Sequence, residues 1–291
     1  MLTLAFHSPS YDSGLVERLL FRVARKWVAG YTSSDAIEAA LHANRRGMSA
    51  ILNFLGEDTA DAGQVDATVN EYLSLMGMMH DRKVRACASV KPTQLGLAID
   101  YGTCLQNFKK LAARAHELGQ FLWIDMEGVK FTEDTITLYL ELLKENPEIG
   151  IAVQAYLKRS GADILHILER GGKVRLVKGA YHELEEHAFA SRDQVDDNYS
   201  RLLKMLADSG NFFAVATHDS KLIDEAIKTS GRCEFQLLMG IRDELKSQLV
   251  AGGAAVAEYI PYGGKWLPYS VRRIRERKRN LLLLARSLVQ Q

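Results

Sequence analysis

The sequence predicts an α/β protein folded as a (βα)8 barrel, and three observations lead to this fold class. Short apolar runs rich in β-branched residues alternate with longer amphipathic segments from about residue 48 to the end. There are eight of these runs, as a closed barrel needs. The chain of 291 residues is close to the length of one complete barrel. An open doubly wound sheet is the alternative that the same alternation allows.

Two amphipathic helices are expected ahead of the first strand, at 15–28 and 34–46. They predict an N-terminal helical arm over residues 1–46 rather than a separate core. The barrel then occupies 47–291 as one structural domain, because no linker or low-complexity segment divides the chain.

The expected strands are short and apolar, and each is followed by a helical pattern. The strands span 48–54, 84–90, 120–125, 149–155, 174–178, 212–217, 233–238 and 255–260. The helical patterns between them include 69–79, 105–119, 135–145, 162–170, 198–210 and 220–228. Several begin beside Asp, Ser or Thr and some end at Gly, as helix caps do. A further helix follows the last strand.

Composition favours a protein that acts on small molecules in the cytoplasm. The formal net charge of +1 is too balanced for a nucleic-acid footprint or a polybasic membrane anchor. Cys87, Cys104 and Cys233 form no CxxC pair, which is typical of buried thiols in a reducing compartment. No segment approaches the roughly 18–20 apolar residues of a membrane span.

Several sequence motifs are absent, which narrows the reaction class. There is no GxGxxG dinucleotide fingerprint and no GxxxxGK[ST] phosphate loop. In HELEEH, His182 and His187 are five residues apart, which is the wrong spacing for a zinc site on one helical face. We therefore expect no metal site.

Polar residues close nearly every expected strand, and this predicts a site. In a (βα)8 barrel the chemistry lies at the C-terminal ends of the strands. The residues there are Asn53, Glu57, Lys91, Asp125, Glu127, Gln154, Tyr156, Lys178, Tyr181, Thr217, His218, Gln236 and Tyr259. One polar strand end is routine, but eight on one rim imply a binding or catalytic site.

The run RRIRERKR near the C-terminus adds a candidate anion clamp. Glu276 lies four residues after Arg272 and three after Arg273, so on a helix one carboxylate can hold both guanidinium groups. Two oriented guanidinium groups suit a substrate carboxylate. A solvated basic helix face is the plainer interpretation of the same residues.

Two other function classes remain open on these residues alone. Lys91 and Lys178 at strand ends allow a Schiff-base aldolase, which needs a lysine nucleophile. A noncatalytic barrel that acts as a binding or scaffold module is the other alternative.

Seven segments in order resemble a known family: SVKPTQLGL, IDMEG, QAYLKR, RLVKGAY, ATHD, EFQLLMG and YIPYGGKWLPYSVRRIRER. The set is similar to the catalytic domain of proline dehydrogenases, the flavoenzymes that open proline catabolism, in their short monofunctional bacterial or archaeal type. RLVKGAY together with YxxRRxxE is highly specific, and the resemblance runs from about residue 20 to the C-terminus. Pro92 and Met239 depart from the family pattern.

The resemblance implies a distorted (βα)8 barrel that binds FAD noncovalently without a Rossmann fold, with its last helix over the barrel mouth. The implied reaction is oxidation of L-proline to 1-pyrroline-5-carboxylate by hydride transfer from C5 to flavin N5, the first step from proline to glutamate. Electrons would pass to a quinone, through transient peripheral contact with the inner face of the membrane. Self-association into a homo-oligomer stays open.

The resemblance also implies roles for individual residues. Asp125, Arg175 and Lys91 are the expected catalytic residues. Substrate contacts are expected from Lys91, Asp125, Leu238, Tyr259, Arg272, Arg273 and Glu276. FAD contacts are expected from Met126, Gln154, Arg175, Val177, Lys178, Gly179, Ala180, Thr217 and His218, with Glu234 and Gln236 as weaker candidates. Tyr259 stands where relatives that prefer hydroxyproline carry a smaller residue, which favours proline.

Overall fold

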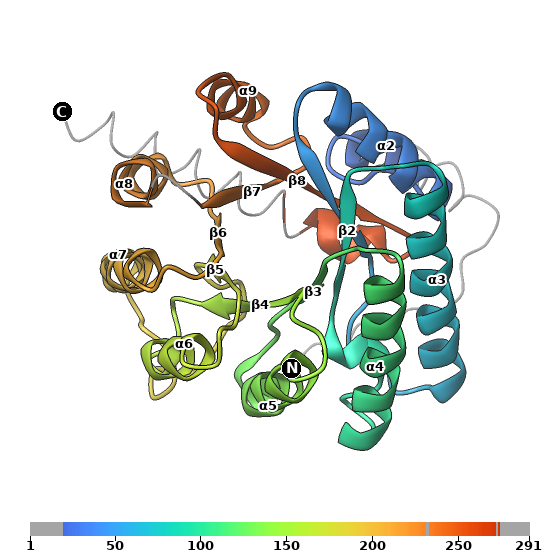
Figure 1. The fold of residues 1–291 in the computed structure, drawn as a ribbon, viewed down its shortest axis with the longest axis horizontal. Coiled ribbons are helices and arrows are strands. Elements are labelled where there is room, and N and C mark those ends of the chain that lie inside the picture. Colours follow the sequence, from blue (N-terminus) through green and yellow to red (C-terminus); the bar gives the residue numbers. More distant parts are fainter. Residues whose placement is uncertain (1–19, 231–232, 272, 274–291) are drawn as a thin grey trace.

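The computed structural model describes residues 20–230, 233–271 and 273, and within them the chain forms a closed barrel of eight parallel strands (Figure 1). The strands are β1 (Ser49–Phe54), β2 (Ala86–Val90), β3 (Leu122–Ile124), β4 (Ile149–Gln154), β5 (Val174–Val177), β6 (Phe213–Ala216), β7 (Glu234–Leu238) and β8 (Ala255–Tyr262). All eight predicted strands are confirmed, with bounds that differ by one or two residues at most ends.

Closure excludes the open sheet. Each strand pairs in parallel with the next, and β8 returns to β1 with Ser49 opposite Ala257 and Phe54 opposite Tyr262. The strands are almost entirely buried, as expected for a parallel sheet covered by helices on its outer face.

Helices surround the barrel, as Figure 1 shows. They are α2 (Ser33–Arg45), α3 (Ala62–Asp81), α4 (Tyr101–Glu117), α5 (Thr132–Leu143), α6 (Ser160–Leu168), α7 (Arg192–Asp208), α8 (Ser220–Ser230) and α9 (Asp243–Ala251), with 3₁₀ turns η1 (Pro92–Leu95) and η2 (Val129–Phe131). Side chains of Asp61, Asp100 and Ser191 cap the starts of α3, α4 and α7 by accepting backbone N–H groups.

Helix α2 packs against both β1 and β8, so it covers the seam where the barrel closes. Its inner face carries Ala36, Ile37, Ala40 and Ala43, all fully buried in the main core. The small alanine side chains let the helix approach the strands closely. The division of the chain at residues 46 and 47 stays a prediction, but α2 itself is part of the barrel's packing.

The chain after β8 turns back toward the barrel mouth. Residues 266–271 are helical, and Trp266 and Tyr269 pack with Trp27, Val28 and Leu55 in a small apolar cluster. Apart from Arg273, the rest of the predicted last helix lies outside the described residues, so its course over the mouth stays a prediction.

Membrane spans and metal sites were not expected from the sequence. Within 20–230, 233–271 and 273, no helix is long and apolar enough to cross a membrane, and no cluster of His, Cys, Asp and Glu suits a metal ion. Cys233 is buried, and Cys87 and Cys104 are free thiols. Burial raises the pKa of Cys87 to about 12 and also raises that of Cys104, so these two thiols stay protonated at neutral pH.

Candidate active site

A cavity of about 450 Å³ opens at the C-terminal ends of the strands, where barrel proteins place their sites. Every strand from β1 to β8 contributes a lining residue or ends beside one. The lining residues are Asn53, Leu55, Lys91, Asp125, Met126, Ala152, Gln154, Arg175, Val177, Lys178, Gly179, Ala180, Tyr181, Ala216, Thr217, His218, Gln236, Leu238, Tyr259, Tyr269 and Arg273.

The cavity brings together most of the residues singled out from the sequence. Of those named for catalysis, substrate or FAD, all but Arg272, Glu276 and the weaker candidate Glu234 line it, and Arg272 and Glu276 lie outside the described residues. Gln236 also lines the cavity, whereas Glu234, at the start of β7, does not. The assigned roles stay predictions, but the side chains share one concave surface.

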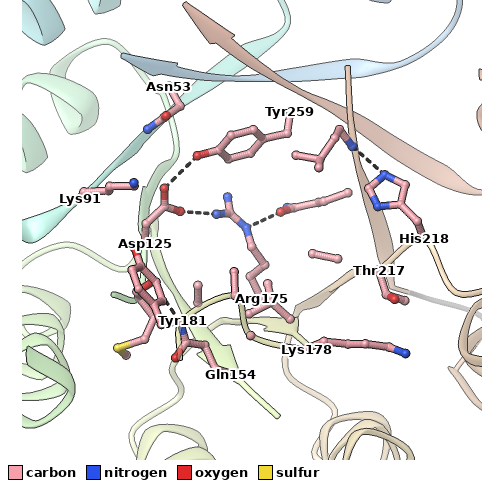
Figure 2. A pocket seen from close by; sticks show the side chains of 18 of the residues that line it. Asn53, Lys91, Asp125, Gln154, Arg175, Lys178, Tyr181, Thr217, His218 and Tyr259 are labelled. Atoms are coloured by element: carbon pink, nitrogen blue, oxygen red, sulfur yellow. Dashed lines mark hydrogen bonds and ion pairs between the residues drawn. The ribbon is translucent and has the colours of Figure 1, made fainter. Parts of the chain in front are cut away.

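Asp125 is the centre of the site's hydrogen bonding. Its Oδ1 accepts hydrogen bonds from Ser89 Oγ at 2.7 Å and from Arg175 Nη1 at 2.6 Å. Its Oδ2 accepts one from the hydroxyl of Tyr259 at 2.9 Å. Figure 2 shows Asp125 between Tyr259 and Arg175. Burial raises the pKa of Tyr259 well above its usual value, so this phenol stays a neutral donor.

Arg175 crosses the floor of the cavity and is itself buried. Its guanidinium lies over the rings of Trp123 and Tyr259, 4.5 and 5.6 Å from their centroids. Its Nε donates to Gln236 Oε1, and its Nη1 donates to Asp125 and Ser89. Nη2 is buried and has no hydrogen-bond partner within the described part of the chain.

Gln154, at the end of β4, has a similar unpaired atom. Its Nε2 donates to the backbone carbonyl of Met126 at 3.3 Å, while its buried Oε1 has no partner among the described residues. Buried polar atoms are rarely left unpaired, because losing water without a replacement costs about 1–3 kcal/mol. An unpaired donor and an unpaired acceptor thus belong to two lining residues of one cavity.

Lys91 and Lys178 both form ion pairs with carboxylates. Lys91 Nζ lies 2.7 Å from Glu57 Oε2, and Lys178 Nζ is paired with Asp196 and lies 2.9 Å from Asp219 Oδ2. A Schiff-base nucleophile needs an Nζ that is free to attack a carbonyl, and both of these Nζ atoms contact carboxylates in ion pairs. The arrangement therefore disfavours the aldolase alternative.

The ion pairs of Lys178 also bear on the predicted phosphate contact. Asp219 precedes α8, Asp196 lies in α7, and Arg192 reaches Asp219 at 3.2 Å. A phosphate beside Lys178 would share the ammonium with both carboxylates. The position of Lys178 near a cofactor phosphate stays a prediction.

Gly179 follows β5 with a φ of +112°, a conformation that side chains rarely adopt. A Cβ built there would lie 2.1 Å from Cδ1 of the Tyr156 ring. We expect Gly179→Ala to lower the unfolding free energy by about 3 kcal/mol, through backbone strain plus overpacking. The measurement is urea unfolding of the cofactor-free protein.

Gly171 supplies a matched control for this prediction. Its φ is +71°, but a Cβ built there meets nothing within 4 Å. Gly171→Ala therefore tests the strain of a positive φ alone and should lower the unfolding free energy by about 1 kcal/mol. Equal losses in the two variants would mean that the Tyr156 contact contributes nothing.

His218 is held as a neutral imidazole on the cavity wall. Its Nε2 accepts the backbone N–H of Leu238 at 3.1 Å, so the proton is on Nδ1 (Figure 2). Burial, together with the nearby cations Lys246, Arg273 and Arg242, lowers its pKa from 6.5 to about 4.

This shift predicts a pH-dependent loss of stability. Because the folded pKa lies below the unfolded one, the unfolded chain binds more protons between pH 6.5 and 4. The contribution of His218 to the unfolding free energy is therefore fully present above pH 6.5, and it falls by about 2–3 kcal/mol as the pH drops to 4. The unfolding free energy of wild type and His218→Gln, measured across this range, should diverge accordingly. Parallel profiles would contradict the shift.

Sequence reasoning missed Ser89, which joins Asp125 to Arg175 from the middle of β2. A signal existed, because Ser89 is polar within an apolar run and shares a strand face with Cys87 and Lys91. Leu55, Ala152, Ala216 and Tyr269 were also missed as lining residues. A signal existed for two of them, because Ala216 begins ATHD and Tyr269 begins YxxRRxxE, whereas Ala152 is an apolar wall residue outside the quoted segments.

The fold and the site together define a (βα)8 barrel protein with a buried charged centre at its C-terminal rim, the arrangement that barrel enzymes use. A family profile described as proline dehydrogenase matches residues 36–285. This chain belongs to the proline dehydrogenase family.

Individual relatives agree with that assignment. Proline dehydrogenase 1 of Bacillus subtilis (strain 168) is 31% identical over 273 residues, covering 91% of this chain and 90% of the relative. Proline dehydrogenase of Deinococcus radiodurans is 31% identical over 287 residues, covering 94% and 93%.

Among solved structures, proline utilization A from Bdellovibrio bacteriovorus, inactivated by N-propargylglycine, superposes with a TM-score of 0.84 at 23% identity. The match covers 90% of this chain and 33% of that one, so this chain spans about a third of the longer protein. The likeness supports the barrel fold.

Proposed function

We propose that this protein is an FAD-dependent proline dehydrogenase that oxidises L-proline to 1-pyrroline-5-carboxylate. The observation that carries the proposal is the cavity: in a chain of the proline dehydrogenase family, it gathers the described residues that the family motifs assign to substrate and flavin. Proline dehydrogenases of similar length that are 31% identical over most of both chains support the substrate.

The residues present fit a flavin on one independent observation. Arg175 Nη2 is an unpaired donor and Gln154 Oε1 is an unpaired acceptor, both buried within lining residues of the cavity. A flavin ring system carries acceptor atoms and an N–H donor, so it can satisfy both. Apolar lining from Met126, Val177 and Leu238 suits its planar faces. These residues, with Ala180, Thr217 and His218, would hold it.

Bound FAD would supply the two-electron acceptor for the hydride that leaves C5 of proline. The chain's own contribution is to fix charges around the reacting atoms. Arg175 holds a permanent positive charge, and Asp125, Ser89 and Gln236 prevent it from rotating. A cation fixed in advance stabilises negative charge that develops during reaction without further reorganisation.

Oxidation must also remove one proton from the substrate amine, and Lys91 and Asp125 are the candidates for accepting it. Asp125 accepts three hydrogen bonds from side chains, and Lys91 is paired with Glu57. If proline binds as the neutral amine, its remaining N–H proton is released only after the hydride has left C5. Asp125 and Lys91 can therefore keep their present hydrogen bonds and ion pair until that point.

The carboxylate of proline is assigned to the arginines that follow β8. Arg273 lines the cavity, with its guanidinium 5.2 Å from the centroid of the Tyr269 ring. We expect Arg273→Ala to raise KM for proline about tenfold or more while FAD stays bound, because a charge-assisted pair is lost. Steady-state kinetics with a flavin absorbance control measure this. An unchanged KM would remove Arg273 from the clamp.

The test of the proposed function is an absorbance spectrum of the purified protein, followed by anaerobic addition of L-proline. We expect a flavin band that bleaches with proline. A protein that stays colourless after incubation with FAD contradicts the proposal. Borohydride trapping of a lysine with a carbonyl substrate would then support the aldolase alternative.

For the electron acceptor we propose a quinone, reached by transient contact with the membrane surface from the cytoplasm. The support is the family assignment alone. Reoxidation of the proline-reduced enzyme by a soluble quinone, compared with oxygen, tests the acceptor. Co-sedimentation with lipid vesicles before and after reduction tests the contact.

A further inference from the structure

The orientation of Arg175 depends on a chain of side chains that runs down the barrel interior below the cavity. Gln236, in the middle of β7, accepts a hydrogen bond from Arg175 Nε through its Oε1. Its Nε2 donates to Glu234 Oε1 at 2.7 Å. Residues 234 and 236 lie on the same face of the strand, so both point into the barrel. Glu234 Oε2 in turn accepts a weak hydrogen bond from Ser49 Oγ at 3.4 Å.

The chemistry of these groups removes the usual ambiguity of a glutamine side chain. An amide has one donor end and one acceptor end, whereas a carboxylate can only accept and an arginine can only donate. With Glu234 below and Arg175 above, one amide orientation forms two hydrogen bonds. The reversed orientation would place donor against donor at Arg175 and acceptor against acceptor at Glu234.

The result for Arg175 is a guanidinium fixed along two edges. Gln236 holds Nε, while Asp125 and Ser89 hold Nη1. The ring of Trp123 covers one face at 4.5 Å. Nη2 is then the one guanidinium nitrogen without a hydrogen-bond partner in the described part of the chain, and its direction follows from the other contacts.

We propose that Glu234 is a positioning residue for Arg175, acting through the side-chain amide of Gln236. Glu234 does not line the cavity, and its carboxylate is linked to Arg175 through Gln236. The effect on turnover rests on the proposed function, in which Arg175 stabilises charge on the flavin. The effect on the side chain of Arg175 does not rest on it.

The first arm of the test reads the side chain directly in cofactor-free protein. In protein labelled with ¹⁵N-arginine, the Nε–H resonance of Arg175 is assigned by its absence from Arg175→Lys. We expect Glu234→Ala to shift this resonance and to speed its exchange with solvent at least about tenfold, because the amide is free to reverse. Ser49→Ala, which removes the hydrogen bond to Glu234 Oε2 and one to the backbone carbonyl of Val256, should leave it unchanged.

The second arm measures turnover of the FAD-loaded enzyme with proline. Glu234→Ala should lower kcat about tenfold and leave KM for proline within about twofold, since the substrate clamp is separate. Glu234→Gln can still accept from Gln236 and should recover kcat to within about threefold. Melting temperatures are measured for every variant, so that general destabilisation is seen separately.

An unchanged Arg175 resonance in Glu234→Ala overturns the proposal, and so does an equal loss of kcat in Glu234→Ala and Ser49→Ala. If Glu234→Ala does not fold, Glu234→Asp replaces it, since its shorter side chain withdraws the carboxylate from Gln236 and should shift the resonance. If wild type fails to oxidise proline, the proposed function falls, while the resonance still decides whether Glu234 orients Arg175.

Discussion

Replacing Arg175 by methionine should lower kcat for proline oxidation about 10²–10³-fold, the range found when one preorganised charge-stabilising donor is removed. The guanidinium is the buried cation nearest to Asp125, and no other described side chain could replace its three hydrogen bonds. Stopped-flow reduction of bound flavin by proline measures the effect on the chemical step. A loss below about tenfold would contradict the assigned role.

Arg175→Lys is the matched control for this prediction. It keeps the charge and compensates Asp125, but lysine lacks the planar guanidinium that meets Asp125 and Gln236 at once. We expect a smaller loss of rate, about tenfold to 10²-fold, with FAD still bound. The methionine variant also leaves Asp125 without its cation, which costs roughly 3–5 kcal/mol for a buried pair, so its folding is checked by circular dichroism.

Asp125→Asn should lower kcat/KM for proline about 10²-fold. Asparagine keeps the shape and one acceptor oxygen, but it removes the negative charge that holds Arg175 Nη1 at 2.6 Å. The unbalanced guanidinium then loses its fixed direction, and the donor hydroxyl of Tyr259 meets an amide instead of a carboxylate. Steady-state kinetics at several proline concentrations separate the effects on kcat and KM.

Ser89→Ala is the control for Asp125, because it removes one neutral hydroxyl that donates to the same Oδ1. We expect less than about tenfold loss from it. The double variant Asp125→Asn with Arg175→Lys should lose less than the product of the two single losses, since the residues act as one unit. Independent losses would show that Asp125 and Arg175 contribute separately.

Much of the fold could be predicted from periodicity alone. Each of the eight strands lies within two residues of its predicted bounds because burial on both faces leaves a continuous apolar run in the sequence. Helix α2 shows the limit of this reasoning. Its amphipathic pattern predicts a helix, but nothing local indicates that its alanine face covers the seam between β8 and β1.

For the candidate site, too, the residues could be predicted from the sequence but their contacts could not. Strand-end positions identified Lys91, Asp125 and Gln154, since parallel strands in a barrel all end at one rim. The side chains that each of these residues contacts could not be predicted. Lys178 meets two carboxylates from α7 and from the residue before α8, and Gly179 faces the ring of Tyr156 rather than open space. Such contacts depend on the register between strands, and no single segment encodes that register.

The sequence by itself determined eight strands alternating with helices, the order of these elements and the set of polar residues at the strand ends, because these depend on local periodicity and on motifs within single segments. The open sheet was excluded only by the pairing of β8 with β1. Only the tertiary structure decided the hydrogen-bond chain from Asp125 through Arg175 and Gln236 to Glu234. Its members lie on three strands, and their side chains meet only when closure of the barrel brings those strands' inner faces together. Charge pairing at such distances along the chain is a property of the assembled core.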